Sequence, residues 1–309
     1  DESLAIITTK VFTPDNSNLK PSRMEKYELG FDLTNKGNIM NLSWFDENLQ
    51  GGYSFESELA VIPYPVYDIY SYFPGEGNQP QLDRTNVDTA IMRNAYKKPC
   101  GKKSIHRRGM EFSFHSQKIE ATGTRFNLSG SWIQSTIRDH SFDYNIKSQY
   151  QMGNDDQLLG IYQSNGREYE RFLTTLRVIQ HMPRLAFIAS LSLKTQWIQR
   201  YQPIINNEYP IGYVNGSGET TFLTEEQARS EEYAFLRQTF DDSYYFTSDK
   251  PPLWYISLKI TKELNNGISF SFYSNNMFMS HPAYKDHKTG RIEKRNPELF
   301  FGAELKYTI

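Results

Sequence analysis

Residues that could carry enzymatic or metal chemistry are scattered along this chain. The histidines are His106, His115, His140, His181, His281 and His287. None of them forms an H-E-x-x-H motif or a comparable pair, so the spacing of metal ligands is missing. Asp155-Asp156 and Asp241-Asp242 could contribute to a loop Ca²⁺ site, but the acidic pattern of a dedicated calcium loop does not occur. The sequence therefore predicts no metal and no cofactor.

Nucleophilic side chains likewise lack the partners that catalysis needs. Ser129-Gly130-Ser131 and Gly216-Ser217-Gly218 do not form a nucleophile elbow, which places its serine between a strand and a helix. Cys100 is the single cysteine, so it cannot form an internal disulfide, and no constellation of Cys or His accompanies it. We predict that the protein is not an enzyme.

Aromatic side chains remain as candidates for ligand recognition, since Phe, Trp and Tyr make up 15% of the chain. Aromatics in long loops offer surfaces on which a ligand can stack, although they can equally pack the loops against each other. We hold the candidate ligand contacts only as a set: Tyr64, Tyr67, Tyr70, Tyr72, Phe73, Tyr209, Tyr213, Tyr244, Tyr245 and Phe246.

Composition alone would describe a soluble globular protein, with 309 residues, 38% hydrophobic, 23% charged and a mean hydropathy of -0.65. A net charge of -2 gives no field that favours nucleic acid, and the basic run from Lys97 to Arg108 is interpreted as a solvated loop. The longest apolar stretch, Leu185 to Leu193, is too short for a membrane-spanning helix. A membrane β-strand, however, needs only about 10 residues with every second one facing lipid.

Alternation with period two is the main structural signal of the sequence. From Pro297 to Ile309, large apolar residues alternate with small or charged ones, as on a β-strand with two different faces. Met24–Leu33 and Ile39–Leu49 alternate in the same way around Asn35-Lys36-Gly37-Asn38, which is typical of a hairpin turn. Further alternating segments are Met110–His115, Thr124–Thr136, Tyr169–Gln180, Phe187–Trp197, Leu253–Leu264 and Ile268–Phe278. We therefore predict about nine antiparallel strands.

The connections between these strands alternate strictly in length. Those at 35–38, 116–123, 181–186 and 265–267 are short, whereas those beginning at Gln50, Ile137, Tyr201 and Met279 are long and irregular. A capping box at Thr224–Gln227 predicts a short helix through about Leu236 within the third long connection. All long loops should then lie at one end of the sheet, as in outer-membrane barrels with extended extracellular loops and tight periplasmic turns. A soluble β-sandwich with recognition loops at one end is the alternative.

Tryptophan and tyrosine positions are consistent with either reading. Trp44, Trp132, Trp197 and the pair Trp254-Tyr255 fall on predicted strands toward the long-loop end. In a membrane barrel they would form an aromatic girdle at the lipid interface, and in a sandwich they would be core residues. The alternating loop lengths favour the membrane girdle.

Three segments resemble a known family. Asn18-Leu19-Lys20-Pro21 followed by Tyr27-Glu28-Leu29-Gly30 resembles the N-L-K-P-E-x-x-x-x-Y-E-L-G stretch that precedes a late barrel strand in TonB-dependent outer-membrane receptors. His181-Met182-Pro183-Arg184 and Asn296–Gly302 are similar to the C-terminal barrel half of the same family. The terminal strand, with Gly302, Leu305 and Tyr307, resembles the signal read by the outer-membrane insertion machinery. It departs from that signal at Phe300, where a polar residue is usual, and at Ile309, which replaces a terminal Phe.

The resemblance implies an all-β, antiparallel up-and-down transmembrane β-barrel, of which residues 1–309 form the C-terminal portion as a single partial domain. Such receptors have about 22 barrel strands around an N-terminal plug. We expect the plug and first strands to be absent here, because Asp1 is preceded by none of them and Asp1-Glu2-Ser3-Leu4 is not a signal peptide. The chain would be a fragment of a longer receptor in the outer membrane of a Gram-negative bacterium.

The function that the resemblance implies is energy-coupled uptake of a bulky nutrient, with the siderophore, vitamin, peptide and oligosaccharide classes left open. Expected partners are outer-membrane lipid, a TonB-type energy transducer acting through the absent plug, the barrel-insertion machinery and a surface lipoprotein, but not nucleic acid. The rival is a soluble or surface-attached β-sandwich that binds glycan or protein. The two differ in where Leu191, Leu193, Leu305 and Tyr307 point: toward lipid, or toward a common interior.

Overall fold

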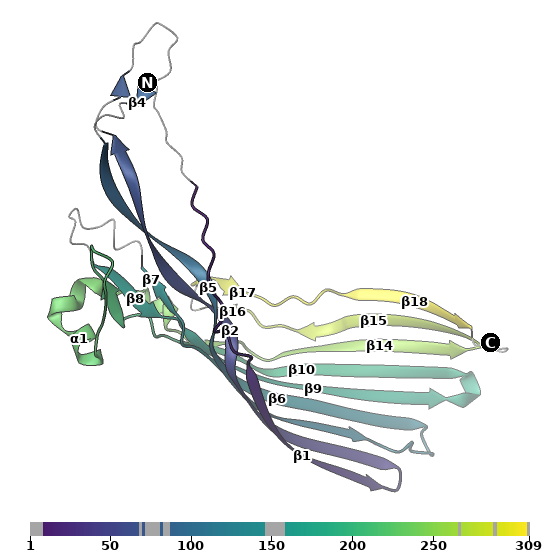
Figure 1. Cartoon of the computed structure of the whole chain (residues 1–309). Coiled ribbons are helices and arrows are strands. Elements are labelled where there is room, and N and C mark those ends of the chain that lie inside the picture. The colour runs from purple at the N-terminus through teal and green to yellow at the C-terminus, as the bar shows by residue number, and fades with distance from the viewer. Residues whose placement is uncertain are drawn as a thin grey trace, which may run out of the picture.

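A computed structural model describes residues 9–67, 70–71, 81–82, 87–145, 158–264, 267–286 and 289–307. It is an all-β structure dominated by one large antiparallel sheet of ten strands (Figure 1). The strand order is β1-β2-β5-β6-β9-β10-β14-β15-β18, with β13 paired to β10 beside this path. The bounds are β1 Arg23–Asn35, β2 Asn38–Tyr67, β5 Val87–His115, β6 Thr124–Asp139, β9 Gly166–Met182, β10 Phe187–Ile204, β13 Ser248–Asp249, β14 Leu253–Glu263, β15 Ile268–Ser280 and β18 Phe300–Tyr307. In the described residues this order agrees with the predicted antiparallel meander of about nine strands.

Tight turns with positive φ angles reverse the chain at the short connections. Lys36 and Gly37 join β1 to β2 with φ angles of 47° and 79°, which suit a two-residue hairpin. The 3₁₀ turn η2 (Pro183–Leu185) ends at Ala186, whose φ of 51° turns the chain into β10. The short connections lie together at one end of the sheet, near the C-terminus, and the long ones lie at the other end (Figure 1).

The large sheet does not close on itself. Its two edges are β1 and β18, which are not paired with each other in the described residues. The predicted antiparallel sheet is therefore present, whereas the described residues form no closed barrel.

Strand register gives the sheet two chemically different faces. Residues directly opposite each other in an antiparallel pair point to the same face, and successive residues alternate. One cross-strand row consists of Leu33, Met40, Phe114, Leu128, Leu176, Leu193, Ile256 and Phe278. The adjacent row consists of Asp32, Asn41, Ser113, Ser129, Thr175, Lys194 and Tyr255. We call the face of the first row the apolar face and that of the second the polar face.

Little of the large sheet is covered by the rest of the chain. A compact folded monomer of 36.1 kDa would expose about 13,000 Å², whereas this chain exposes 21421 Å². On the apolar face, Leu29 is 58% exposed, Phe31 64% and Leu305 73%. A sheet that leaves such residues uncovered has a surface for something other than itself.

The buried core lies instead among the long connections. A second sheet has the order β12-β11-β8-β7, with β7 Phe142–Tyr144, β8 Leu159–Gln163, β11 Gly212–Val214 and β12 Thr220–Phe222. Leu159, Ile161 and Val214 are almost fully buried there, and Leu59 of β2 packs against them. The small sheet is thereby attached to the base of the long hairpin formed by β2 and β5 (Figure 1).

The connection that begins at Gln50 differs from its prediction as an irregular segment. Here β2 and β5 continue far past their neighbours as a two-stranded ribbon that projects from the sheet (Figure 1). The short pair β3 (Tyr70–Ser71) and β4 (Gln81–Leu82) extends the same connection. Pro63 and Pro65, which obscured the strand signal, are tolerated because the ribbon has free edges that need no N–H donor at these positions.

The third long connection contains the predicted helix in shortened form. Helix α1 (Glu225–Arg229) begins at the capping box in which Thr224 and Gln227 bond reciprocally, as predicted. Ser230 is extended and ends the helix, and the 3₁₀ turns η3 (Glu231–Leu236) and η4 (Asp242–Tyr244) follow. The fourth long connection holds the small pair β16 (Tyr284–Lys285) and β17 (Ile292–Glu293). None of the helices in the described ranges has the length and apolar character needed to cross a membrane.

Glycine permits close packing of Phe45 on the polar face. Gly109 lies directly opposite Phe45, and a Cβ atom added there would be 2.6 Å from the Phe45 ring and 2.6 Å from the backbone oxygen of Trp132. Because backbone cannot move aside easily, Gly109→Ala should lower the free energy of unfolding by about 1–3 kcal/mol. Denaturant unfolding followed by tryptophan fluorescence measures this loss.

Gly30→Ala is the matched control on the same face. The nearest atom to its added Cβ would be the Leu42 backbone oxygen at 3.9 Å, an ordinary contact. It should leave stability unchanged or slightly raised. Equal losses from both substitutions would show that the Phe45 contact is unimportant.

Candidate functional site

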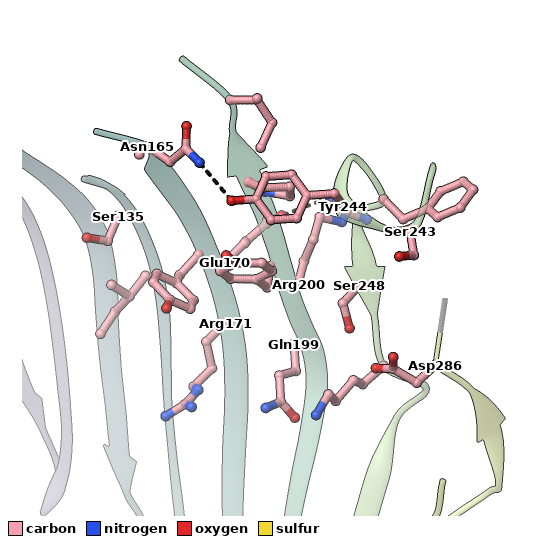
Figure 2. A pocket seen from close by; sticks show the side chains of 18 residues that line it. Ser135, Asn165, Glu170, Arg171, Gln199, Arg200, Ser243, Tyr244, Ser248 and Asp286 are labelled. Carbon is pink, nitrogen blue, oxygen red and sulfur yellow. Dashed lines mark hydrogen bonds and ion pairs between the residues drawn. The ribbon is translucent and has the colours of Figure 1, made fainter. Parts of the chain in front are cut away.

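A cavity of about 640 Å³ lies where β9 and β10 meet the third long connection (Figure 2). Its walls come from the long-loop ends of these strands, from the segment around η4, and from residues near β13 and β16. The lining includes Ser135, Asn165, Tyr169, Arg171, Gln199, Tyr201, Ser243, Tyr244, Phe246, Ser248, Lys250 and Asp286. The site therefore joins the large sheet to its loops.

Aromatic rings form much of the cavity wall. Tyr169 and Tyr201 are directly opposite each other on the polar face, and their ring centroids are 5.2 Å apart. On the loop side, Tyr244 stacks on Phe240 at 4.5 Å, and Tyr245 meets both rings edge-on. Such rings provide flat apolar surfaces with hydroxyl groups at their edges.

Asn165 fixes the loop side of the cavity to the sheet side. Its Nδ2 donates to the Tyr244 hydroxyl at 3.0 Å, as Figure 2 shows. Its Oδ1 accepts hydrogen bonds from the backbone N–H groups of Asn206 and Asn207 at 2.8 and 3.2 Å. One side chain thus positions both the start of the third long connection and an aromatic wall.

At the level of the cavity, the charged side chains on the two faces of the sheet differ in their ion-pair partners. Arg200 pairs with Glu170 at 3.0 Å and with Asp249 at 2.9 Å, and Glu170 also accepts from Trp132 Nε1 at 3.0 Å. Strand alternation places Arg171, the next residue after Glu170, on the polar face opposite Gln199. The Arg171 guanidinium forms no ion pair with any residue that the structure describes.

The predicted aromatic contacts are divided among several places. Tyr244 and Phe246 line the cavity and Tyr245 flanks it. Tyr209 lies between the Arg229 and Arg237 guanidinium groups and borders a second cavity of about 540 Å³. Tyr213 stacks on Tyr233, and Tyr64 and Tyr67 lie on the ribbon, so neither group joins the main cavity. Tyr72 and Phe73 lie outside the described residues, and of Tyr70 only its place in β3 is described.

The tryptophans predicted as a girdle share the apolar face. Trp44, Met110, Trp132 and Phe172 follow one another across the strands, with Ile198 beyond a bulge. Trp197 lies at that bulge, and its Nε1 donates to Thr174 of the same face at 2.9 Å. Trp254 pairs with Thr195, also on this face.

Tyr255 differs from the prediction that grouped it with these tryptophans. It lies opposite Lys194 on the polar face, with the Lys194 ammonium 5.8 Å from its ring centroid. Adjacent residues of a strand face opposite ways, so Trp254 and Tyr255 cannot share a girdle.

The residues of the predicted assembly signal lie on β18, the edge strand. Leu305 and Tyr307 are on the apolar face, opposite Phe270 and Ile268, and are 73% and 63% exposed. Gly302 is on the polar face beneath Tyr273, whose hydroxyl would be 2.6 Å from an added Cβ. Ile309 lies outside the described residues.

Sequence reasoning missed Tyr169, Tyr201, Arg171, Gln199 and Lys250 as cavity residues. Tyr169 and Arg171 belong to the predicted strand Tyr169–Gln180, which was searched for its faces rather than for ligand contacts. Gln199 and Tyr201 lie beyond the predicted end of the next strand at Trp197, although β10 continues to Ile204. Pairing outward from the turn at 183–186 would have brought Tyr169 near Tyr201, but the bulge between Gln196 and Ile198 shifts the register by one residue. That bulge has no signal of its own in the sequence.

Within the described ranges, no three His, Cys, Asp or Glu side chains are grouped so that they could hold a metal ion. Comparison with protein-family models, with curated proteins and with solved structures gave no match for this chain. The two faces of the sheet and the cavity are therefore the features that bear on function.

Replacing Asn165 with alanine should loosen the third long connection. The amide protons of Asn206 and Asn207 lose their acceptor, and we expect them to exchange with solvent at least about tenfold faster. Hydrogen exchange followed by mass spectrometry over 205–210 measures this change. Asn296→Ala, at an exposed position, is the control. Unchanged protection in the Asn165 variant would contradict the positioning role.

The stability of the contact between the small sheet and β5 should depend on pH through Asp143 of β7. Burial alone would raise the pKa of Asp143, but hydrogen bonds from Lys97 and Ser57 outweigh it and lower the pKa below 3.8. Lys97 Nζ lies 2.6 Å from the carboxylate. A lowered folded-state pKa adds stability that is present above the unfolded pKa and is lost as the pH falls through the folded one.

Asp143→Asn should therefore lower the unfolding temperature at pH 7, and the difference from the parent protein should shrink below about pH 3.8. Lys97→Met should give a similar loss at pH 7, and the double variant should lose little more than either single one. Additive losses would mean that the two groups do not act as a pair. Scanning fluorimetry between pH 3 and pH 7 makes the comparison.

Proposed function

We propose that this chain forms part of the barrel wall of a TonB-dependent receptor in the bacterial outer membrane, where it takes part in energy-coupled uptake of a bulky nutrient. The observation that carries the proposal is the continuous apolar face of the large sheet. The row from Leu33 to Phe278 carries no charge from β1 to β15, and Leu305 and Tyr307 continue the same face on β18. The adjacent row, from Asp32 to Tyr255, lies on the opposite face and is mostly polar, as expected for a wall between lipid and a water-filled lumen.

Contact with lipid explains the exposed apolar face better than burial in an internal core does. Leu191, Leu305 and Tyr307 point the same way and are 41%, 73% and 63% exposed. A sandwich needs a second sheet over this face, and the second sheet that the structure describes packs against the ribbon instead. In hydrocarbon, a sheet survives only if its backbone groups are paired, which agrees with long antiparallel ladders.

Two further features support the receptor assignment. The long connections gather at one end of the sheet, where extracellular loops would capture a ligand, and the cavity lies at that same end (Figure 1). In this arrangement further strands would pair with the free edges of β1 and β18, a TonB-type transducer would supply force through a plug, and a surface lipoprotein would assist at the loops. The resemblance at Asn18–Gly30 points to the same family.

Lipid contact can be measured with the natural fluorophores, because all four tryptophans of the chain lie on the apolar face. After reconstitution into vesicles, brominated acyl chains should quench most of the tryptophan fluorescence, whereas aqueous iodide should quench little. Strong iodide quenching without bromine quenching would overturn the membrane assignment. So would a chain that stays soluble and monomeric without detergent.

A charge on either side of the same strand gives a second test. Leu191→Arg places a guanidinium on the apolar face, and the neighbouring Ser192→Arg places it on the polar face. The first should lower the stability of the vesicle-inserted protein by about 2–4 kcal/mol and the second by much less. Urea titration in vesicles compares them, and equal effects would contradict a lipid-facing Leu191.

A further inference from the structure

Three basic residues contact or neighbour Gln199, a residue of the cavity wall. Arg171 is its direct cross-strand neighbour on β9, and Figure 2 shows both side chains extending the same way from adjacent strands. The backbone N–H of Lys250 donates to the Gln199 backbone oxygen at 3.0 Å. Arg295, from the fourth long connection, donates through Nη1 to Gln199 Oε1 at 3.0 Å. Segments far apart in the sequence thus bring three basic residues to this part of the sheet: Arg171 and Lys250 line the cavity, and Arg295 binds Gln199 of its wall.

In the described part of the chain, none of these three residues forms an ion pair with a carboxylate, whereas some other basic residues do. Among the described residues, Arg295 binds the neutral oxygens of Gln199 and Pro251, and its buried Nε atom has no hydrogen-bond partner there. The Lys250 ammonium lies 5.6 Å from the Tyr284 ring centroid and forms no ion pair among the described residues. By contrast, Arg107 pairs with Glu47, and Lys259 pairs with Glu304.

The nearby carboxylates each have partners of their own. Glu170 and Asp249 pair with Arg200. Glu293 accepts from the Tyr284 hydroxyl at 3.1 Å. Asp286 lines the cavity and accepts from the Thr289 backbone at 2.8 Å.

Arg295 is a partly buried cation that no described carboxylate neutralises. Burial lowers its pKa, and the nearest charge effect comes only from the Tyr284 phenol. A desolvated guanidinium with an unsatisfied N–H gains more from a carboxylate than an exposed one does. With Arg171 and Lys250 in the cavity wall and Arg295 beside Gln199, this corner carries positive charge that a negatively charged ligand would complement.

The rest of the cavity fits a hydroxylated ring. Tyr169 and Tyr201 present adjacent ring surfaces, and neutral hydrogen-bonding groups surround them at Ser135, Ser243 and Ser248. A pyranose has apolar C–H faces and hydroxyls around its edge, so it matches an aromatic wall bordered by hydroxyls. The volume of about 640 Å³ accommodates a short oligosaccharide.

We propose that the cavity binds an acidic oligosaccharide, with the carboxylate of a uronic-acid unit held by Arg171 and Lys250 beside the Gln199–Arg295 hydrogen bond and its ring against Tyr169 and Tyr201. This inference rests on the proposed function in that it names the class of nutrient taken up. Such a site should prefer carboxylated sugars to neutral sugars, and acidic sugars to acidic peptides.

Calorimetry on the detergent-solubilised full chain tests the proposal, with trigalacturonate, the neutral galactotriose and tetraglutamate as probes. Trigalacturonate should bind at least about tenfold more tightly than either of the others, and added salt should reduce this preference. Equal binding of galactotriose would overturn the carboxylate site, and tighter binding of tetraglutamate would overturn the sugar assignment. Absence of trigalacturonate binding would overturn both.

Arg171→Gln and Arg177→Gln form a matched pair of variants. Both arginines are exposed on the polar face of β9, but only Arg171 lines the cavity. Arg171→Gln should weaken trigalacturonate binding about tenfold and leave galactotriose binding unchanged, whereas Arg177→Gln should change neither. Equal effects of the two variants would contradict the site.

Failure of this inference is distinguishable from failure of the proposed function. Quenching by brominated lipid reports on the apolar face and does not depend on the cavity. Trigalacturonate binding in detergent reports on the cavity and does not depend on insertion into a bilayer.

Discussion

Backbone pairing between long antiparallel strands is the interaction on which this molecule depends. The large sheet contributes few residues to a core, and the best-buried side chains, such as Leu159 and Val214, lie among the long connections. Ladder hydrogen bonds therefore hold the strands, while the alternation that they impose sorts side chains into two faces. An apolar face that the chain leaves uncovered makes the surroundings part of the stability of the fold.

The large sheet determines the geometry of the cavity. Tyr169 and Tyr201 face each other because β9 and β10 stay in register beyond the bulge, and Asn165 then ties the loop aromatics to the strand ends. Residues that recognise a ligand on rigid strands are held more accurately than residues on loops alone. The loops supply Tyr244 and Lys250, and the fourth connection supplies Arg295, so the site forms only when three separate segments are in place.

Local pattern predicted the sheet better than it predicted the site. Alternation around Lys36-Gly37 gave the first hairpin, and the same rule placed Trp44 and Trp132 on one face. The ribbon beyond Gln50 was missed because Pro63 and Pro65 weaken the strand signal, although a free edge tolerates them. The convergence of Arg171, Lys250 and Arg295 depends on tertiary contacts between distant segments, which no local period encodes.

The prolines of the ribbon also bear on self-association. An exposed strand edge is a template for pairing with another chain, and proline removes the donors that such pairing requires. The ribbon carries Pro63 and Pro65 on β2 and Pro99 on β5, in the stretch where β1 and β6 no longer cover these strands. Strands β1 and β18 contain no proline. The chain thus blocks intermolecular growth along the ribbon and leaves open the two edges at which a sheet can be extended, so aggregation of the isolated chain should begin there.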